Sequence, residues 1–579
     1  MEKKLVIIYY NIFNNWVKLM EYWIIDENFF IIDSNNLENV IPHMYGFSVG
    51  KNGIFTDNYY KKLGKYELPE PQGIYIMIRI SGDEIILNQD FLGSYGIYIY
   101  ENKNKNYFAL SNSFLLLEEH LVGKYDISFN KDFASSLIST DLCPYSIQET
   151  LINEIKQIPS NACISINKKK KEFNINYIDY KENTIPLESE EGLKIIDNWI
   201  DKWGYIIRSL KKQTDDISFD LSGGFDSRIV LSILLNSGID LNTVLIHSDE
   251  DKGNDHDVDL KIARNISLKF GFKLNNLKLD NNGIIWSTKN ILFKSLYTKL
   301  GFHKQFSLNN KYYNKPKFIF KGSGGEFLRG YPGIPFSEYI KIICLRKIKS
   351  HENEFYRSSV RLIKKSESLI KGKKKFINDF EISSIFNKYL LGRNHFGKGS
   401  VERFMTNIYT LQPLIDPDIQ KINFGINRTS SHDLIAYIFY RLSKDLIEFP
   451  FQGNRKLDSE SIKKAKLLNQ NYMPYKIKLN YNFNYYIDDK RKSPVPSSKY
   501  ENIQEYLKNM FNSFTYIKEI TEIYDKDVYN WANDFSKISN YHPFKHHYAL
   551  LAIIIIIENL KIKKKSISNL KNKIFFNLK

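Results

Sequence analysis

One segment near the middle of the chain constrains the fold more than any other. The sequence DISFDL at residues 216–221 leads into SGGFD at residues 222–226, and an apolar run, SRIVLSILLNS, follows at residues 227–237. This pattern predicts a strand, a tight turn and a helix. A further strand-like run at residues 243–247 and a helical pattern at residues 260–270 continue the alternation. Such alternation predicts a parallel sheet with covering helices.

The turn between the predicted strand and helix has the chemistry of an anion site. Two consecutive glycines let the main chain approach an anion closely, and successive N–H groups can form a concave nest. The helix adds its positive end, worth about 0.3–1 kcal/mol for an exposed anion. Ser222 and Ser227 add hydroxyl donors, and Asp226 fits beside a phosphate if a magnesium ion bridges the two. The alternative is a plain turn in which Ser222 caps the helix.

The sequence SGGFDSR at a strand-to-helix junction resembles the pyrophosphate loop of N-type ATP pyrophosphatases. This PP-loop (adenine nucleotide α hydrolase-like) branch contains asparagine synthetases, β-lactam synthetases and lasso-peptide cyclases. The resemblance implies that the chain binds ATP and Mg²⁺, adenylates a carboxylate with release of pyrophosphate, and then forms an amide with release of AMP. It also implies a set of nucleotide contacts in this part of the chain: Leu221, Ser222, Gly223, Gly224, Asp226, Ser227 and Ile246.

A second glycine-rich segment, FKGSGGEFLRGYP at residues 320–332, resembles the GEGADELFGGYP segment of the same family. The resemblance implies that Gly324 and Gly325 contact the nucleotide. Direct counting puts Gly325 where the family has a metal-binding aspartate, whereas one deletion puts Glu326 there. We prefer Glu326 as the second metal ligand with Asp226, because a magnesium clamp without a second carboxylate leaves the phosphate charge poorly balanced. The alternative is a glycine-rich turn with a surface glutamate.

Three weaker matches follow the same family order. Residues 257–264 resemble an acidic helix start with an Ala-Arg pair, although acids near any helix start are also ordinary. Residues 411–419, which contain Asp416, resemble a segment near the substrate pocket, although Asp-Pro also makes a simple helix cap. Residues 449–456 are a possible pocket loop.

The family also places a lysine late in the chain, where it stabilises charge on the adenylate. Lys490, Lys492 and Lys456 are the candidates here. We assign Lys490 to the expected catalytic set, together with Asp226 and Glu326.

The first part of the chain has short alternating apolar runs at residues 73–80, 84–87 and 96–100, which predict strands in hairpins. The sequences QDFLGSYGIYIY and FALSN within residues 89–112 resemble class II glutamine amidotransferase domains. That resemblance implies an Ntn-hydrolase-like α+β sandwich. Such domains use an N-terminal cysteine as nucleophile, but residue 2 is Glu2 and the first cysteine is Cys143. We therefore expect no glutamine hydrolysis.

The 579 residues exceed what one core usually supports. We expect an α/β protein with an amidotransferase-like domain at residues 1–185 and a doubly wound ATP pyrophosphatase domain at residues 186–579. The part from about residue 335 is expected to be mainly helical. The longest apolar run, YALLAIIIII at residues 548–557, is too short for a membrane span and predicts a buried helix. With only three cysteines and no signal peptide at the start, we expect a cytoplasmic protein.

The formal net charge of +17 raises the expectation of a polyanionic partner, although a solvated, lysine-rich surface is the alternative. Two other functions therefore stay open: a PP-loop tRNA-modifying enzyme, and a non-catalytic nucleotide-binding protein of the same fold. For the ligase, the expected partners are a small-molecule or peptide carboxylate and an amine donor. The sequence does not identify these two substrates or the oligomeric state.

Overall fold

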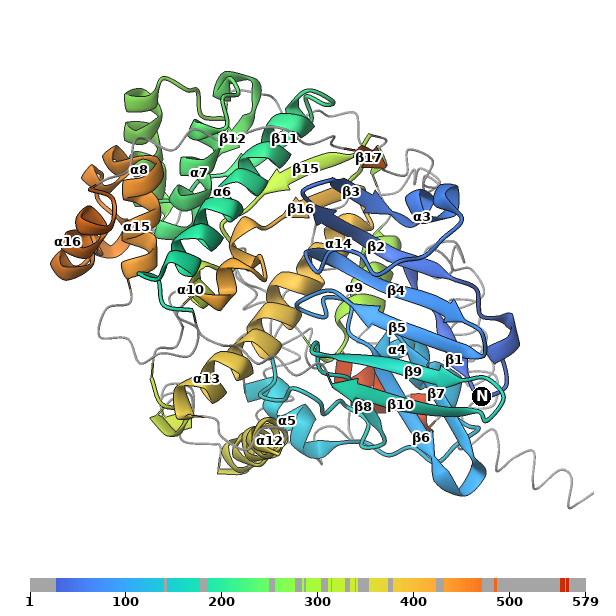
Figure 1. The fold of residues 1–579 in the computed structure, drawn as a ribbon. Helices are drawn as coiled ribbons and strands as arrows, with labels where there is room; N and C mark the ends of the chain where they lie inside the picture. The colour runs from blue at the N-terminus through green and yellow to red at the C-terminus, as the bar shows by residue number, and fades with distance from the viewer. Residues whose placement is uncertain are drawn as a thin grey trace, which may run out of the picture.

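The computed structural model describes a large part of the chain as a mixed α/β protein with three main sheets (Figure 1). The described residues are 28–139, 143–177, 185–248, 256–275, 284–285, 288–302, 311–313, 315–328, 334–338, 340–341, 353–372, 378–422, 432–470, 484–486, 552–557 and 559–561.

Two sheets form mainly from the N-terminal part, and their neighbouring strands are antiparallel with one exception. The smaller sheet has the order β1 (Ile31–Asp33), β7 (Tyr107–Ser111), β6 (Tyr98–Asn102), β8 (Ile155–Gln157). The larger sheet has the order β10 (Glu172–Tyr177), β9 (Ala162–Asn167), β5 (Glu84–Gln89), β4 (Gly73–Ser81), β2 (His43–Gly50), β3 (Gly53–Thr56), β17 (Asn484–Tyr486). Strands β4, β5 and β6 confirm the strands expected from period-2 alternation. The rings of Phe108 and Phe173 lie 5.1 Å apart, so the two sheets pack on each other.

Strand β17 is the exception, because it comes from late in the sequence and pairs parallel with β3. Tyr485 lies opposite Ile54 in this pair. A segment far from the N-terminal part therefore supplies the edge strand of its larger sheet.

The third sheet is parallel throughout, with the order β12 (Leu245–His247), β11 (Ile217–Asp220), β15 (Lys317–Phe320), β16 (Ile408–Leu411). The chain runs from β11 to β12 on one side and then returns to β15 on the other. Such a reversal opens a crevice at the carboxyl ends of the two central strands. Helices α7 (Phe225–Asn236) and α8 (His256–Phe270) follow β11 and β12, so the predicted alternation and parallel sheet are confirmed.

Helix α6 (Glu190–Lys211) precedes this sheet and anchors the segment after β16. The Trp199 Nε1 donates to Pro413 O at 2.9 Å, and the Trp203 Nε1 donates to Asp416 Oδ2 at 2.9 Å. Asp416 is completely buried and also pairs with Lys202. The contacts of Asp416 therefore hold α6 against the segment after β16.

The described residues after about residue 335 are largely helical, as expected, but two of the segments described there are strands. The missed strands are β16 and β17, and β16 completes the parallel sheet. The remaining helices include a π-helix, η4, and are α3 (Asp57–Leu63), α4 (Phe114–Leu121), α5 (Lys131–Ser139), α9 (Thr288–Lys299), α10 (Gly325–Leu328), α12 (Asn353–Lys371), α13 (Asp379–Asn387), η4 (Lys388–Gly397), α14 (Lys398–Phe404), α15 (Asp433–Leu442) and α16 (Ser459–Leu468).

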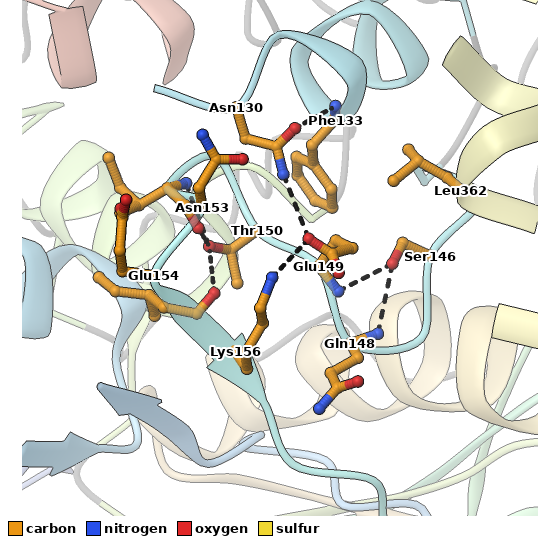
Figure 2. A network of polar contacts seen from close by, with 12 residues as sticks. Asn130, Phe133, Ser146, Gln148, Glu149, Thr150, Asn153, Glu154, Lys156 and Leu362 are labelled. Carbon is orange, nitrogen blue, oxygen red and sulfur yellow. Dashed lines mark hydrogen bonds and ion pairs between the residues drawn. The ribbon is translucent and has the colours of Figure 1, made fainter. Parts of the chain in front are cut away.

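Residues 143–158 lie between the smaller sheet and the later helices. Figure 2 shows Glu149 accepting hydrogen bonds from Lys156 Nζ at 2.7 Å and from Asn130 Nδ2 at 3.4 Å. From η4, the buried Arg393 donates to Ile147 O at 2.7 Å and to Ile158 O at 2.9 Å. This segment therefore joins the π-helix to the N-terminal part.

One hydrophobic core runs through both parts of the chain. It contains residues of all three sheets and also residues 552–557, which are helical and buried. Beside them, Asn559 Nδ2 donates to Glu118 Oε2 of α4 at 2.8 Å. The buried helix predicted from the apolar run is confirmed over residues 552–557. Among the described helices, none combines the length and the apolar character that a membrane crossing needs.

Candidate functional site

Two loops meet at the crevice between β11 and β15. A Cβ atom at Gly322 would lie 2.6 Å from Ser227 N, and one at Gly325 would lie 2.1 Å from Asp226 Cγ. Both distances are far below van der Waals contact, so only glycine permits this approach. The structure therefore brings Gly325 against Asp226, and Glu326 is the next residue of α10. A metal-binding role for Glu326 stays a prediction.

The two glycines after Ser222 have different surroundings. Gly223 N donates to Asp259 Oδ1 at 2.9 Å, and a Cβ atom at Gly223 would lie 2.4 Å from that oxygen. At Gly224 a Cβ atom would meet, among the described residues, only Ser222 Oγ, at 3.4 Å. The φ of Gly224 is −81°, which any residue adopts. Gly223 is therefore required by close packing, while the side of Gly224 that lacks a side chain faces open space.

The N–H groups of the loop are largely satisfied by side chains of the protein. Ser222 N donates to Ser227 Oγ at 3.1 Å, and Gly224 N donates to Ser222 Oγ at 3.3 Å. Gly224 is the N-cap of α7 and, as a glycine, it offers that helix no side-chain cap. The alternative in which Ser222 caps the helix is therefore absent. The uncapped N-terminus of α7 is the part of this loop best suited to an anion.

A buried arginine ties the loop to the segment between α15 and α16. The Arg228 guanidinium donates to Gly223 O at 3.1 Å and to three carbonyls of that segment, and it lies 3.9 Å from the centre of the Phe451 ring. The three carbonyls are those of Leu446, Phe449 and Pro450. Gln452 N also donates to Gly223 O, at 3.0 Å. Burial lowers the pKa of Arg228 to about 9, against the opposing charge of Asp259, so Arg228 is cationic at neutral pH.

The two predicted metal ligands, Asp226 and Glu326, lie in the first turns of α7 and α10 and are partly exposed. Carboxylate oxygens suit Mg²⁺, which commonly takes one or two carboxylates together with phosphate oxygens. Within the described residues, no group of three or more His, Cys, Asp or Glu side chains is arranged to hold a metal ion. The donor set therefore fits Mg²⁺ brought in with a phosphate ligand better than a metal held by protein alone.

Other predicted site residues are buried and pack inside the protein, so their side chains are not exposed at the site. Leu221 and Ile246 are buried, and Ser227 is nearly so. Leu221 N donates to His247 O at 2.8 Å, and the carbonyl of Ile246 accepts from Asn275 N at 2.8 Å. Gly324 has a φ of 93° and packs against Ile415, so its left-handed backbone requires glycine.

Several predicted residues fall outside the described residues. These are Lys490 and Lys492, the two late lysines, and Glu2 at the start of the chain. Lys456, the third lysine candidate, is exposed just after the segment that Arg228 holds.

Sequence reasoning missed the roles of Arg228 and Asp259. Arg228 carried a usable signal, because it is a charged residue in the first turn of an otherwise apolar helix. Asp259 carried no signal beyond its place near a helix start, since the pattern does not tell which way the carboxylate points.

No protein-family model matches the chain, and no curated protein was found that resembles it.

Proposed function

We propose that this chain is an asparagine synthetase-like, ATP-dependent carbon–nitrogen ligase that forms AMP. The observation that carries the proposal is the loop at residues 222–227. It has the sequence SGGFDS, it lies where the strand order of a parallel sheet reverses, and the helix that follows begins at a glycine N-cap that has no side chain. The open side of Gly224 leaves room for a ligand at this N-terminus.

In the proposed reaction, an oxygen of the substrate carboxylate attacks the α-phosphorus of ATP, and the bond to the β-phosphate oxygen breaks. Pyrophosphate then leaves towards the N-terminus of α7, whose N–H groups and dipole favour an anion. A neutral amine attacks the acyl carbon, AMP departs, and the nitrogen loses a proton to give the amide. Mg²⁺, when bound, neutralises phosphate charge, and Asp226 and Glu326 would hold it.

The proposal also includes a specific fold for each of the two domains. The strand order β12-β11-β15-β16 supports a doubly wound PP-loop domain, which we assign to residues 186–579. The two packed sheets of the N-terminal part support an Ntn-hydrolase-like domain at residues 1–185. Contacts such as that of Asn559 with Glu118 mean that late residues also complete the first domain.

The test is the exchange of labelled pyrophosphate into ATP, measured with a panel of carboxylic acids. Asp226→Asn should lower the exchange rate by at least about 100-fold, because it removes a charge from the metal and phosphate site. Its melting temperature should stay near that of the unaltered protein. Asp215→Asn is the matched control, since Asp215 is 96% exposed at the opposite end of β11 and should leave exchange unchanged.

Exchange at the normal rate in the Asp226→Asn variant would remove Asp226 from the site. If the unaltered protein neither binds ATP nor exchanges pyrophosphate with any acid, the ligase proposal fails. Salt-sensitive binding of tRNA together with ATP turnover would instead favour a PP-loop tRNA-modifying enzyme.

A further inference from the structure

The peptide groups of Gly223 are held between two buried charges of opposite sign. Its N–H donates to Asp259 Oδ1 at 2.9 Å, and its carbonyl accepts from Arg228 Nη2 at 3.1 Å. Asp259 is 8% exposed and Arg228 is fully buried. The next residue, Gly224, is the N-cap of α7, so this pair of charges lies directly behind the candidate anion site.

The Asp259 carboxylate matters for the charge of Arg228, because the other hydrogen bonds of Arg228 go to neutral groups. They go to the carbonyls of Leu446, Phe449 and Pro450. Backbone carbonyls satisfy N–H donors but carry no net charge. Among the charges that act on Arg228, the opposing one is that of Asp259. Arg455 adds a second positive charge near Arg228, so the Asp259 carboxylate is the negative charge that offsets these cations behind the loop.

We infer that Asp259 tunes the affinity of the loop for phosphate anions. Its carboxylate fixes Gly223 and cancels the charge of Arg228, so the loop holds pyrophosphate loosely enough to release it. Without that negative charge, Arg228 would add an unbalanced cation behind the N-terminus of α7. This inference rests on the proposed function and assigns Asp259 a positioning and charge-tuning role, because the carboxylate faces the loop and not the ligand.

The experiment is Asp259→Asn, with the dissociation constant of magnesium pyrophosphate measured by calorimetry. The amide oxygen of asparagine can still accept from Gly223 N, so the loop keeps its shape while the local charge becomes more positive by one. Pyrophosphate and ATP should both bind at least about tenfold more tightly, because charges interact strongly where solvent is partly excluded. The affinity should also fall more steeply with added salt.

Asp215→Asn is again the matched control, because it changes the net charge of the protein equally. Its carboxylate is exposed, pairs with Lys211 and lies at the far end of β11, so pyrophosphate affinity should change by less than about twofold. If the asparagine variant does not fold, Asp259→Ser takes its place. Serine is a smaller neutral acceptor, and this variant should also bind pyrophosphate more tightly than the unaltered protein.

A gain in affinity separates charge tuning from a merely structural role, since structural damage weakens binding. Equal or weaker pyrophosphate binding in a folded Asp259→Asn variant overturns the inference and leaves the ligase proposal standing, provided the unaltered protein binds ATP. If the unaltered protein binds neither ATP nor pyrophosphate, the ligase proposal fails and this inference fails with it.

Discussion

Gly223 and Gly224 are adjacent, yet each excludes a side chain for its own reason. A Cβ atom at Gly223 would collide with Asp259 Oδ1 at 2.4 Å and crowd Ile262 Cδ1 at 2.9 Å. At Gly224 the protein leaves space, and the backbone is in an ordinary extended conformation. At the residue scale, the first glycine therefore serves folding, and the second is available to serve binding.

This difference gives a paired prediction. Gly224→Ala should fold with an unchanged melting temperature but bind ATP at least about tenfold more weakly, because its methyl group enters the proposed ligand space. Gly223→Ala should destabilise the protein by about 1–3 kcal/mol through overpacking against Asp259. Scanning calorimetry measures stability and isothermal titration measures ATP affinity. Normal ATP affinity in the Gly224→Ala variant would mean that the ligand lies elsewhere.

At the scale of elements, the π-helix η4 stands between the N-terminal part and the candidate site. A Cβ atom at Gly392 would lie 3.0 Å from Leu92 and 3.2 Å from Phe327, the neighbour of Glu326. Arg393 joins the same element to the segment at residues 143–158. Single π-helical turns are rare and often lie near functional sites. Here the element fixes α10, and with it Glu326, against the N-terminal part.

Removing the side chain that holds η4 should be costly. Arg393→Met leaves the carbonyls of Ile147 and Ile158 without their buried donor, and it should destabilise the protein by about 2–4 kcal/mol. Urea unfolding followed by circular dichroism gives the change. Arg361→Met is the control, because Arg361 is half-exposed and pairs with Asp132, so its loss should cost less than about 1 kcal/mol. Equal losses in the two variants would contradict the anchoring role of Arg393.

Local pattern predicted the elements whose own sequence is periodic. The strands β4, β5, β11 and β12 and the helices α7 and α8 belong to this group. Strand β16 was missed because it is only four residues long and gains its identity from pairing with β15, where Ile408 lies opposite Lys317. The π-helix was missed because its apolar spacing does not distinguish it from an α-helix.

The candidate site, like the fold, was predictable only where its residues lie in a recognisable sequence pattern. The segments that contain Asp226 and Glu326 were recognisable because each is a glycine-rich loop after one of two neighbouring parallel strands. The roles of these two residues as metal ligands stay predictions. The link from Asp259 to Gly223 spans 36 residues and depends on the direction in which a helix side chain points. Sequence pattern carries no information on that direction.

At the scale of the whole molecule, the hydrophobic core does not divide at the expected domain boundary. Residues 552–557 belong to the same core as α4 and as Trp199 and Trp203 of α6. Strand β17 also completes a sheet of the N-terminal part. The two parts should therefore unfold together.

Ile556→Ala tests this coupling. Ile556 is fully buried, and its truncation should cost about 2–5 kcal/mol. Tryptophan fluorescence, to which the buried Trp199 and Trp203 contribute, should shift to the same lower midpoint as circular dichroism. Leu467→Ala is the control, because Leu467 is 64% exposed. A fluorescence midpoint that stays in place while circular dichroism shifts would show that the two parts unfold independently.

The late position of residues 552–557 also has a consequence for how the chain is made. The strands before residue 177 leave the ribosome long before the segment that fills their core. At about 5–20 residues per second, translation from residue 177 to residue 552 takes roughly 20–75 s. For that interval the newly made sheets display an incomplete apolar face, so we expect nascent chains to depend on chaperones until synthesis is finished.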